Sequence, residues 1–459
     1  MPPERDEPTT LAPGAPDVAT NGHTNGVATQ GPWGGGGGWG GGGMGGQMAA
    51  GSVIAPPGGW LRTFESLKVR DFRILWVGML FSFIGMQMGM IARQWLVYDL
   101  TGSTTALGVV GAFSAIPMLL LSIPGGVVAD RVRKKNLLLA AQTITGVLAF
   151  TIGFLIITGH IQLWHIVAVS IISGGVMTFN MPARQALISE LVGPRYLMNA
   201  IALNSAGMNL TRIAAPVAAG LLIAGVGMAN TYFVYAATYV IVVAFLFMLP
   251  NGVQLDGPRQ SPIRDALDGI MYLRDNKIIL SLMVLATVPA IFAMPYQMML
   301  PVYAKDILKI GPQGMGLMMG ATGIGALVGS LIVASMGDFQ HKGRVLLGAA
   351  VGFGLMIALF ANSTFVPVSL VLLALLGMAS TAYMAMNQTL VQTRISDEIR
   401  GRVMGIYMMS WGLMPLGTLP AGFLGDVIGV PMTLTLGGLI MVGCALLISF
   451  LVPELRRLK

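Results

Sequence analysis

The sequence predicts an all-α membrane protein whose twelve transmembrane helices form two pseudo-symmetric six-helix halves. An apolar composition, apolar stretches of span length and a weak internal repeat lead to this fold class. Of the 459 residues, 54% are hydrophobic and 10% are charged, whereas soluble domains have about 25% charged residues. A helix needs about 20 apolar residues to cross the hydrocarbon layer of a membrane. Twelve such spans with short loops use almost all of residues 60–459, so we expect no extramembrane catalytic domain.

Residues 1–59 differ from the rest of the chain and contain no apolar run long enough for a signal peptide. Glycine fills twelve of the sixteen positions from 31 to 46, and such a segment buries too little apolar surface to offset its conformational entropy. We expect a disordered cytoplasmic tail. After it, Phe64, Leu67 and Phe72 stand among basic residues, which predicts a short amphipathic stretch on the membrane surface before the first span.

The two six-span halves are predicted at residues 60–250 and 278–459, and a cytoplasmic linker at residues 251–277 joins them through a surface helix. The halves resemble each other at an offset of about 202 to 208 residues, as transporter repeats do. Ala219–Gly227 aligns with Ala421–Gly429 without a gap. The spans are predicted at 74–96, 105–127, 137–158, 163–181, 200–224, 231–250, 278–301, 314–336, 345–362, 366–386, 403–424 and 432–452.

Lysine and arginine residues predict the orientation, because positive loops stay on the cytoplasmic side of a membrane. Alternate loops place twenty-two of the 27 basic residues on one side, and only Lys305 and Lys309 on the other. Both termini are therefore expected in the cytoplasm, with the spans in the plasma (inner) membrane. The net charge of +8 is explained by these topology signals, and no nucleic-acid partner is expected.

The residues that hold cofactors elsewhere are scarce or scattered. Cys444 is the only cysteine and lies in an apolar stretch, and the four histidines have no spacing that would gather them around a metal. No phosphate-binding Gly-Lys-Ser/Thr loop occurs. We therefore expect no metal, no cofactor and no ATP site, and a driving force from an ion gradient.

The loop after the second span combines one acid with four bases. It reads Gly125-Gly-Val-Val-Ala-Asp-Arg-Val-Arg-Lys-Lys135. With twelve spans in two halves, this loop resembles the signature loop of the major facilitator superfamily, and the residues that fit are Gly126, Asp130, Arg131, Lys134 and Lys135. Arg133 stands where many members have glycine. The second copy, after the eighth span, keeps the acid Asp338 but loses much else.

A carboxylate at a helix end can accept hydrogen bonds from the N-terminus of a neighbouring helix. The family resemblance implies that Asp130 latches the start of the eleventh span near Arg400 when the cytoplasmic side is closed. The alternative is that Asp130 only neutralises the basic cluster. We favour the latch.

Residues 62–453 are similar to one branch of that superfamily, the bacterial drug and siderophore exporters. The resemblance rests on packing and loop signatures such as Phe72–Trp76, Trp95–Ser103, Pro182–Ala186 and Arg400–Val403. It implies a monomeric secondary transporter, embedded in the lipid bilayer, that exports a small amphipathic organic compound. The alternatives are an uptake facilitator or a lysophospholipid flippase on the same fold. An intramembrane enzyme would need reactive side chains that converge within the spans, which the sequence lacks.

Charged residues within the predicted spans are rare, since 44 of the 46 charged side chains lie outside them. No acid lies within a predicted span, since Asp99, Asp130 and Asp426 lie only at span ends. Met86 stands where branch members often have aspartate. A coupling proton therefore has no obvious carrier. The two charges inside spans are Arg93 and Arg212.

Arg212 lies midway along the fifth span and needs a polar partner. It either binds an anionic group of the substrate or donates to backbone carbonyls of adjacent helices. The sequence favours the second, structural interpretation, because the branch carries arginine there whatever its cargo. The residues predicted to face a substrate cavity are Gln87, Arg93, Asn204, Asn209, Arg212, Gln297, Tyr383 and Asn387.

Overall fold

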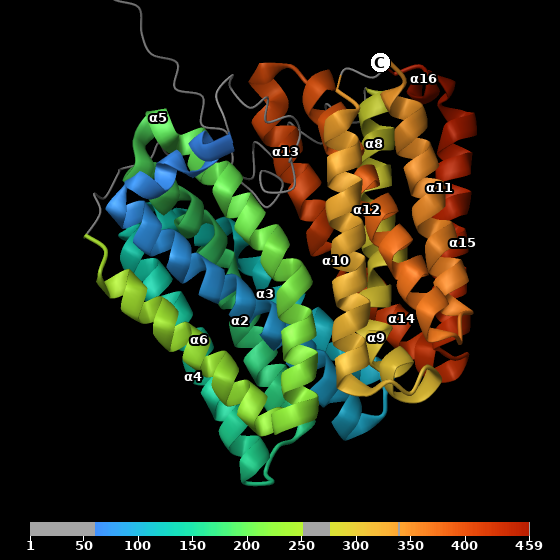
Figure 1. The fold of residues 1–459 in the computed structure, drawn as a ribbon. Coiled ribbons are helices and arrows are strands. Elements are labelled where there is room, and N and C mark those ends of the chain that lie inside the picture. Colours follow the sequence, from blue (N-terminus) through green and yellow to red (C-terminus); the bar gives the residue numbers. More distant parts are fainter. Residues whose placement is uncertain (1–59, 251–275, 338–339, 459) are drawn as a thin grey trace, which may run out of the picture. The chain divides into compact units, whose positions relative to one another are not determined.

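The computed structural model describes residues 60–250, 276–337 and 340–458, and every regular element within these ranges is helical. The predicted tail and almost all of the predicted linker helix lie outside the described residues. Figure 1 shows the described helices as two groups, one coloured from blue to yellow-green and one from yellow to red. These groups correspond to the two predicted halves.

The N-terminal half follows a short 3-10 helix, η1 (Trp60–Lys68), and its helices are α2 (Arg70–Thr101), α3 (Thr104–Arg131), α4 (Lys134–Ile157), α5 (Leu163–Val226) and α6 (Met228–Phe247). The C-terminal half consists of α8 (Lys277–Val288), η2 (Pro289–Ala293), η3 (Met294–Met299), α9 (Leu300–Val302), η4 (Tyr303–Ile307), α10 (Gly311–Ser335), α11 (Lys342–Ala361), α12 (Val366–Arg394), α13 (Asp397–Gly412), α14 (Pro415–Val427), α15 (Val430–Leu451) and α16 (Pro453–Arg456).

Ten of the described helical segments are long and apolar enough to cross a membrane, whereas the sequence predicts twelve spans. The fourth and fifth predicted spans are two helices that meet at a kink within α5, so residues 182–199, predicted as a loop, are helical except at Gly193. One residue, Gly193, interrupts this helix with φ 64° and ψ 175°. Glycine tolerates such a positive φ, and Pro194 after it fits the start of a new helical segment.

The eleventh predicted span accounts for the other difference. It is divided into α13 and α14, and the break falls just before Pro415. The seventh span is also irregular: α8 ends at Val288 and continues through π and 3-10 turns. Prolines at positions 289, 295 and 301 explain this irregularity, because proline cannot donate the hydrogen bond that continues an α-helix.

The amphipathic stretch predicted before the first span is only partly correct. Phe64 in η1 is exposed, as expected, but Phe72 belongs to α2 and is buried in the core with Leu75 and Met79. Many apolar side chains instead cover the outside of the transmembrane helices, including Leu120, Val240 and Phe450. Such a surface suits contact with lipid chains rather than with water.

Candidate functional site

Two helix pairs form the largest contacts between the halves: α3 packs on α14, and α5 packs on α10. Glycine brings the backbones together in both pairs. A Cβ atom on Gly422 would lie 2.7 Å from the carbonyl oxygen of Thr104, and one on Gly220 would lie 2.5 Å from that of Pro312. Neither site has room for a side chain. Gly220 and Gly422 are equivalent in the sequence repeat, so the repeat corresponds to equivalent contacts between the halves.

The carboxylate of Asp426, at the C-terminal end of α14, binds the N-terminus of α3 in the other half. Its Oδ1 accepts a hydrogen bond from the backbone N–H of Thr104 at 2.7 Å, and its Oδ2 accepts one from the N–H of Thr105 at 2.9 Å. The hydroxyls of Ser103 and Thr104 donate to the same carboxylate at 2.6 and 2.8 Å. We name this region of the bundle the Asp426 end.

Asp426 lies beyond the predicted eleventh span and is exposed to solvent. The desolvation that it does experience raises its pKa, but the hydrogen bonds from Ser103, Thr105 and Thr104 outweigh this effect and hold the pKa well below the ordinary carboxyl value. The group is therefore ionised at neutral pH.

Two further contacts between the halves lie at the Asp426 end. Lys305 in η4 donates to Asp99 at the end of α2, with 2.6 Å between Nζ and Oδ1. The hydroxyl of Tyr98 donates to the carboxylate of Asp306. Lys305 and Asp99 are about half exposed, so this ion pair contributes little stability.

The two arginines predicted inside spans approach aromatic residues. Arg93 lies near Tyr232 and Tyr235 of α6. Arg212 of α5 lies near Tyr296 of η3, in the other half. Within the described part of the chain, neither guanidinium has a hydrogen bond or an ion pair, so the expected backbone partner of Arg212 is not found there.

The other predicted cavity residues have different environments. Gln297 donates a hydrogen bond to the Tyr296 hydroxyl at 3.4 Å, and Asn204 is buried with an Oδ1 atom that has no partner among the described residues. Gln87 and Asn209 are half-buried.

Tyr383 and Asn387 of α12 are fully buried and point to α8. The Tyr383 hydroxyl donates to the Leu285 carbonyl, and the Asn387 amide donates to the Leu282 carbonyl at 3.1 Å. These contacts brace α12 against α8 and give the two side chains a packing role.

The predicted gating loop lies only partly within the described residues. Gly126, Asp130 and Arg131 are placed in α3, but nothing is described of their side chains, and Asp338 lies outside the described residues. The latch at Asp130 therefore remains a prediction.

The three remaining predicted gating residues, Lys134, Lys135 and Arg400, differ in how far they are exposed to solvent. Lys134 is half-buried and Arg400 is exposed. The sequence places Lys135 in the basic cluster of the gating loop. In the structure it is buried and donates to the carbonyls of Leu249 and Phe247. Its charge thus satisfies the C-terminus of α6, where a cation is favourable.

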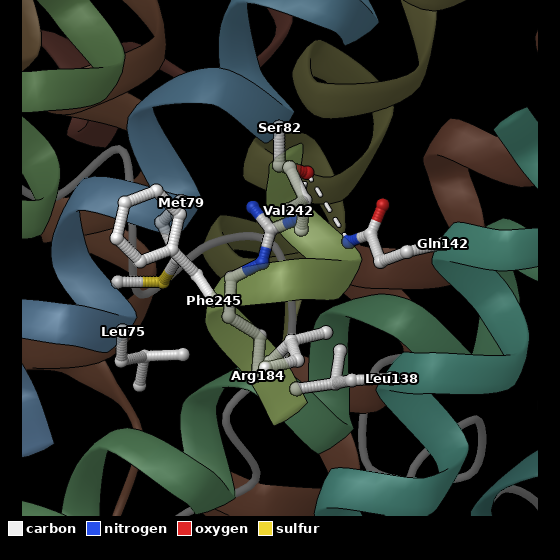
Figure 2. Close-up of a pocket in the computed structure, with 10 residues that line it drawn as sticks. Leu75, Met79, Ser82, Leu138, Gln142, Arg184, Val242 and Phe245 are labelled. Atoms are coloured by element: carbon white, nitrogen blue, oxygen red, sulfur yellow. Dashed lines mark hydrogen bonds between the residues drawn. The ribbon is translucent and has the colours of Figure 1, made fainter. Parts of the chain in front are cut away.

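Arg184 is a buried cation that the sequence assigns to a loop. It is 4% exposed, and its guanidinium donates to Ser82 at 3.1 Å and to Asn180 at 3.0 Å and covers the ring of Phe83. Figure 2 shows the guanidinium directed toward Ser82, whose hydroxyl also accepts a hydrogen bond from Gln142. The assignment failed because residues 182–192, predicted as part of a loop, continue the helix of the fourth span. In the sequence, Arg184 stood out only as part of the Pro182–Ala186 signature of the family branch.

Among the residues that the structure describes, no group of histidine, cysteine and carboxylate side chains could hold a metal ion.

The sequence profile of the family described as transmembrane secretion effector matches residues 62–458. Curated relatives align over most of the chain. The staphyloferrin A transporter of Staphylococcus aureus is 25% identical over 82% of this chain and 95% of its own. The multidrug efflux pump Tap of Mycolicibacterium fortuitum is 24% identical over 80% of this chain and 92% of its own. The enterobactin exporter of Citrobacter koseri is 25% identical over 87% of this chain and 96% of its own.

Solved structures confirm the fold. A mutant of the nucleoside transporter NupG superposes with a TM-score of 0.68 at 16% identity, covering 84% of this chain and 99% of that one. A bacterial homologue of the human lysosomal transporter Spinster, in an inward-facing conformation, gives a TM-score of 0.67 at 12% identity, covering 84% and 97%. The chain thus has the two-half helical fold that the sequence predicts.

Proposed function

Since the chain belongs to the transmembrane secretion effector family of the major facilitator superfamily, we propose that it exports small amphipathic organic compounds of the drug or siderophore kind by alternating access. The observation that carries the proposal is the similarity over at least four-fifths of the chain to relatives that are a siderophore transporter, a multidrug efflux pump and a siderophore exporter. Transport itself follows from the family, and the direction and the cargo are the proposal.

The proposed orientation places the protein in the plasma (inner) membrane as a monomer with both termini in the cytoplasm. The lopsided distribution of lysine and arginine supports it. In this orientation the Asp426 end faces outward. The contacts of Asp426 and Tyr98 across the halves then hold the outer side closed, which is one of the two states that alternating access requires.

Arg93 and Arg212 are the proposed contacts for an anionic group of the cargo. Both lie within predicted spans, and neither has an ion pair or a hydrogen bond in the described part of the chain. A guanidinium away from water is stabilised by a charged or polar partner, and a carboxylate or catecholate of the cargo would supply one. This differs from the structural role that the sequence favours for Arg212. Gln87, Asn204, Asn209 and Gln297 are proposed as neutral contacts.

An ion gradient is the proposed driving force, with a proton as the candidate ion. We further propose that Asp130 latches α13 near Arg400 when the cytoplasmic side closes, with Gly126, Arg131 and Lys134 shaping that loop. The position of Asp130 at the end of α3, the helix that packs on α14, supports this role.

Vesicles test the direction and the cargo class. Purified protein in proteoliposomes of known orientation should move a siderophore or a cationic dye, chemically unchanged, from the face that carries the termini to the other. Movement only in the opposite direction would favour the uptake facilitator, and movement of lysolipid alone would favour the flippase. A chemically altered product would favour an enzyme. Protein with Gly422→Leu, which cannot bring α3 and α14 together, is the matched control.

A further inference from the structure

The N-terminus of α3 is capped by residues from both halves of the molecule. The first N–H groups of any helix lack partners within the helix. In α3 the N–H of Ala106 donates to the hydroxyl of Ser103 at 3.3 Å, which is a cap from the same half. The N–H groups of Thr104 and Thr105 donate to Asp426 in the other half. The cap of α3 is therefore complete only while the halves are together.

Close backbone packing lets the carboxylate reach its partners. The Thr104 hydroxyl also lies 2.6 Å from the carbonyl oxygen of Gly422, so its one proton is shared between that carbonyl and Asp426. A Cβ atom on Gly425 would lie 2.5 Å from the same hydroxyl. Glycines one helical turn or less before Asp426 thus allow α14 to approach the start of α3. The arrangement is specific, because each carboxylate oxygen accepts from a backbone N–H and Oδ2 also accepts from the Ser103 hydroxyl.

The contact is also suited to opening. A negative charge at a helix N-terminus is favoured by the helix dipole and by charge-assisted hydrogen bonds. Asp426 is exposed, so water can replace the protein donors when the helices separate, and no charge is left buried. Such a contact stabilises the closed state of this end and still allows the open state to form.

We propose that Asp426 is the gating residue of the Asp426 end, where its carboxylate holds the halves together by capping α3 and releases it when that side opens. The inference rests on the proposed alternating access.

The contacts Gly108–Thr418 and Leu119–Gly412 show that α3 and α14–α13 run antiparallel. Asp426 therefore lies at the end of this helix pair where α3 begins, and Asp130, in the last turn of α3, belongs to the opposite end.

Distances between spin labels test the proposal without any substrate. With Cys444 replaced by serine, labels at His160→Cys and Thr364→Cys, both exposed positions, report the separation of the halves at the Asp426 end. Asp426→Ala should raise the ratio of open to closed molecules about tenfold or more, as expected for losing hydrogen bonds to a charged group. Asp426→Glu, which keeps the charge, should restore part of the closed population.

Two controls keep the outcome interpretable. Asp99→Asn removes the exposed ion pair with Lys305 and should leave the distances nearly unchanged. The double variant Ser103→Ala, Thr104→Val removes hydroxyl donors to Asp426 from the other half and should also raise the open population. It tests the same contact if Asp426→Ala folds poorly. Unchanged distances in folded Asp426→Ala protein, or equal effects of Asp99→Asn and Asp426→Ala, would overturn the proposal. If the Asp426 end opens in the variant but the protein transports none of the tested compounds, the proposed cargo is refuted and the proposed role of Asp426 is supported.

Discussion

The α3–α14 and α5–α10 contacts are equivalent in the repeat, but only the first carries a carboxylate. Both are built on glycine, and α5 and α14 are each followed by a glycine with positive φ, Gly227 at 85° and Gly429 at 86°. At the position of Asp426, however, α5 has Ala224. Helix α10 needs less capping, because Pro312 in its first turn has no N–H. The two contacts thus have the same close backbone packing, but α3–α14 adds a hydrogen-bonded carboxylate, whereas α5–α10 has an alanine at the equivalent position.

The largest expected effects come from filling the glycine contacts. Gly422→Leu and Gly220→Leu should each force a helix pair apart and destabilise the closed arrangement by about 1–3 kcal/mol, as overpacking does. Melting temperature and spin-label distances at the Asp426 end measure this. Gly225→Leu is the matched control, because nothing lies within 4 Å of its Cβ position. If Gly225→Leu were as disruptive as Gly422→Leu, close approach of the helices would not be the reason.

The α5–α10 contact carries Arg212 instead of a gate. Replacing it in Arg212→Gln should weaken binding of an anionic siderophore by about 10- to 100-fold, since a charge-assisted contact contributes about 1.5–3 kcal/mol. Binding of a neutral compound should change little. Titration of both compounds, with the melting temperature measured alongside, separates the two roles of Arg212. Equal loss for both compounds together with a lower melting temperature would support the structural interpretation instead.

The Lys305–Asp99 pair should contribute least among the contacts at the Asp426 end. Its side chains are about half exposed, and such pairs contribute about 0–1 kcal/mol. Lys305→Ala should therefore change the melting temperature and the transport rate only slightly at physiological salt. A loss of transport comparable to that of Asp426→Ala would show that the gate is shared more evenly than the geometry indicates.

Moderate changes in pH should not open the gate. The pKa of Asp426 is depressed in the folded chain, so the ionised contact is present above the ordinary carboxyl pKa of about 3.9 and is lost only as the pH falls through the lower folded-state value. Spin-label distances at the Asp426 end should be the same at pH 5.5 and pH 8. Opening between these values would mean that another group, or a weaker contact, controls this end.

The sequence predicts the membrane class, the two halves and the glycine alignment, because composition and repeats are properties of the chain itself. It does not predict the role of Asp426, whose partners Ser103 and Thr104 lie more than 300 positions away. Arg184 was missed for a related reason: a helix that continues past Pro182 looks like a loop when only hydrophobicity is considered. Partners that meet through tertiary packing leave no local pattern.

The most direct test of alternating access compares both ends of the bundle in one variant. Labels at His160→Cys and Thr364→Cys report the Asp426 end, and labels at Asn136→Cys and Gln340→Cys report the opposite end, all at exposed positions. In Asp426→Ala the first distance should lengthen and the second should shorten, because closing one side accompanies opening the other. A longer first distance with an unchanged second distance would contradict the account, since the two ends would then move independently.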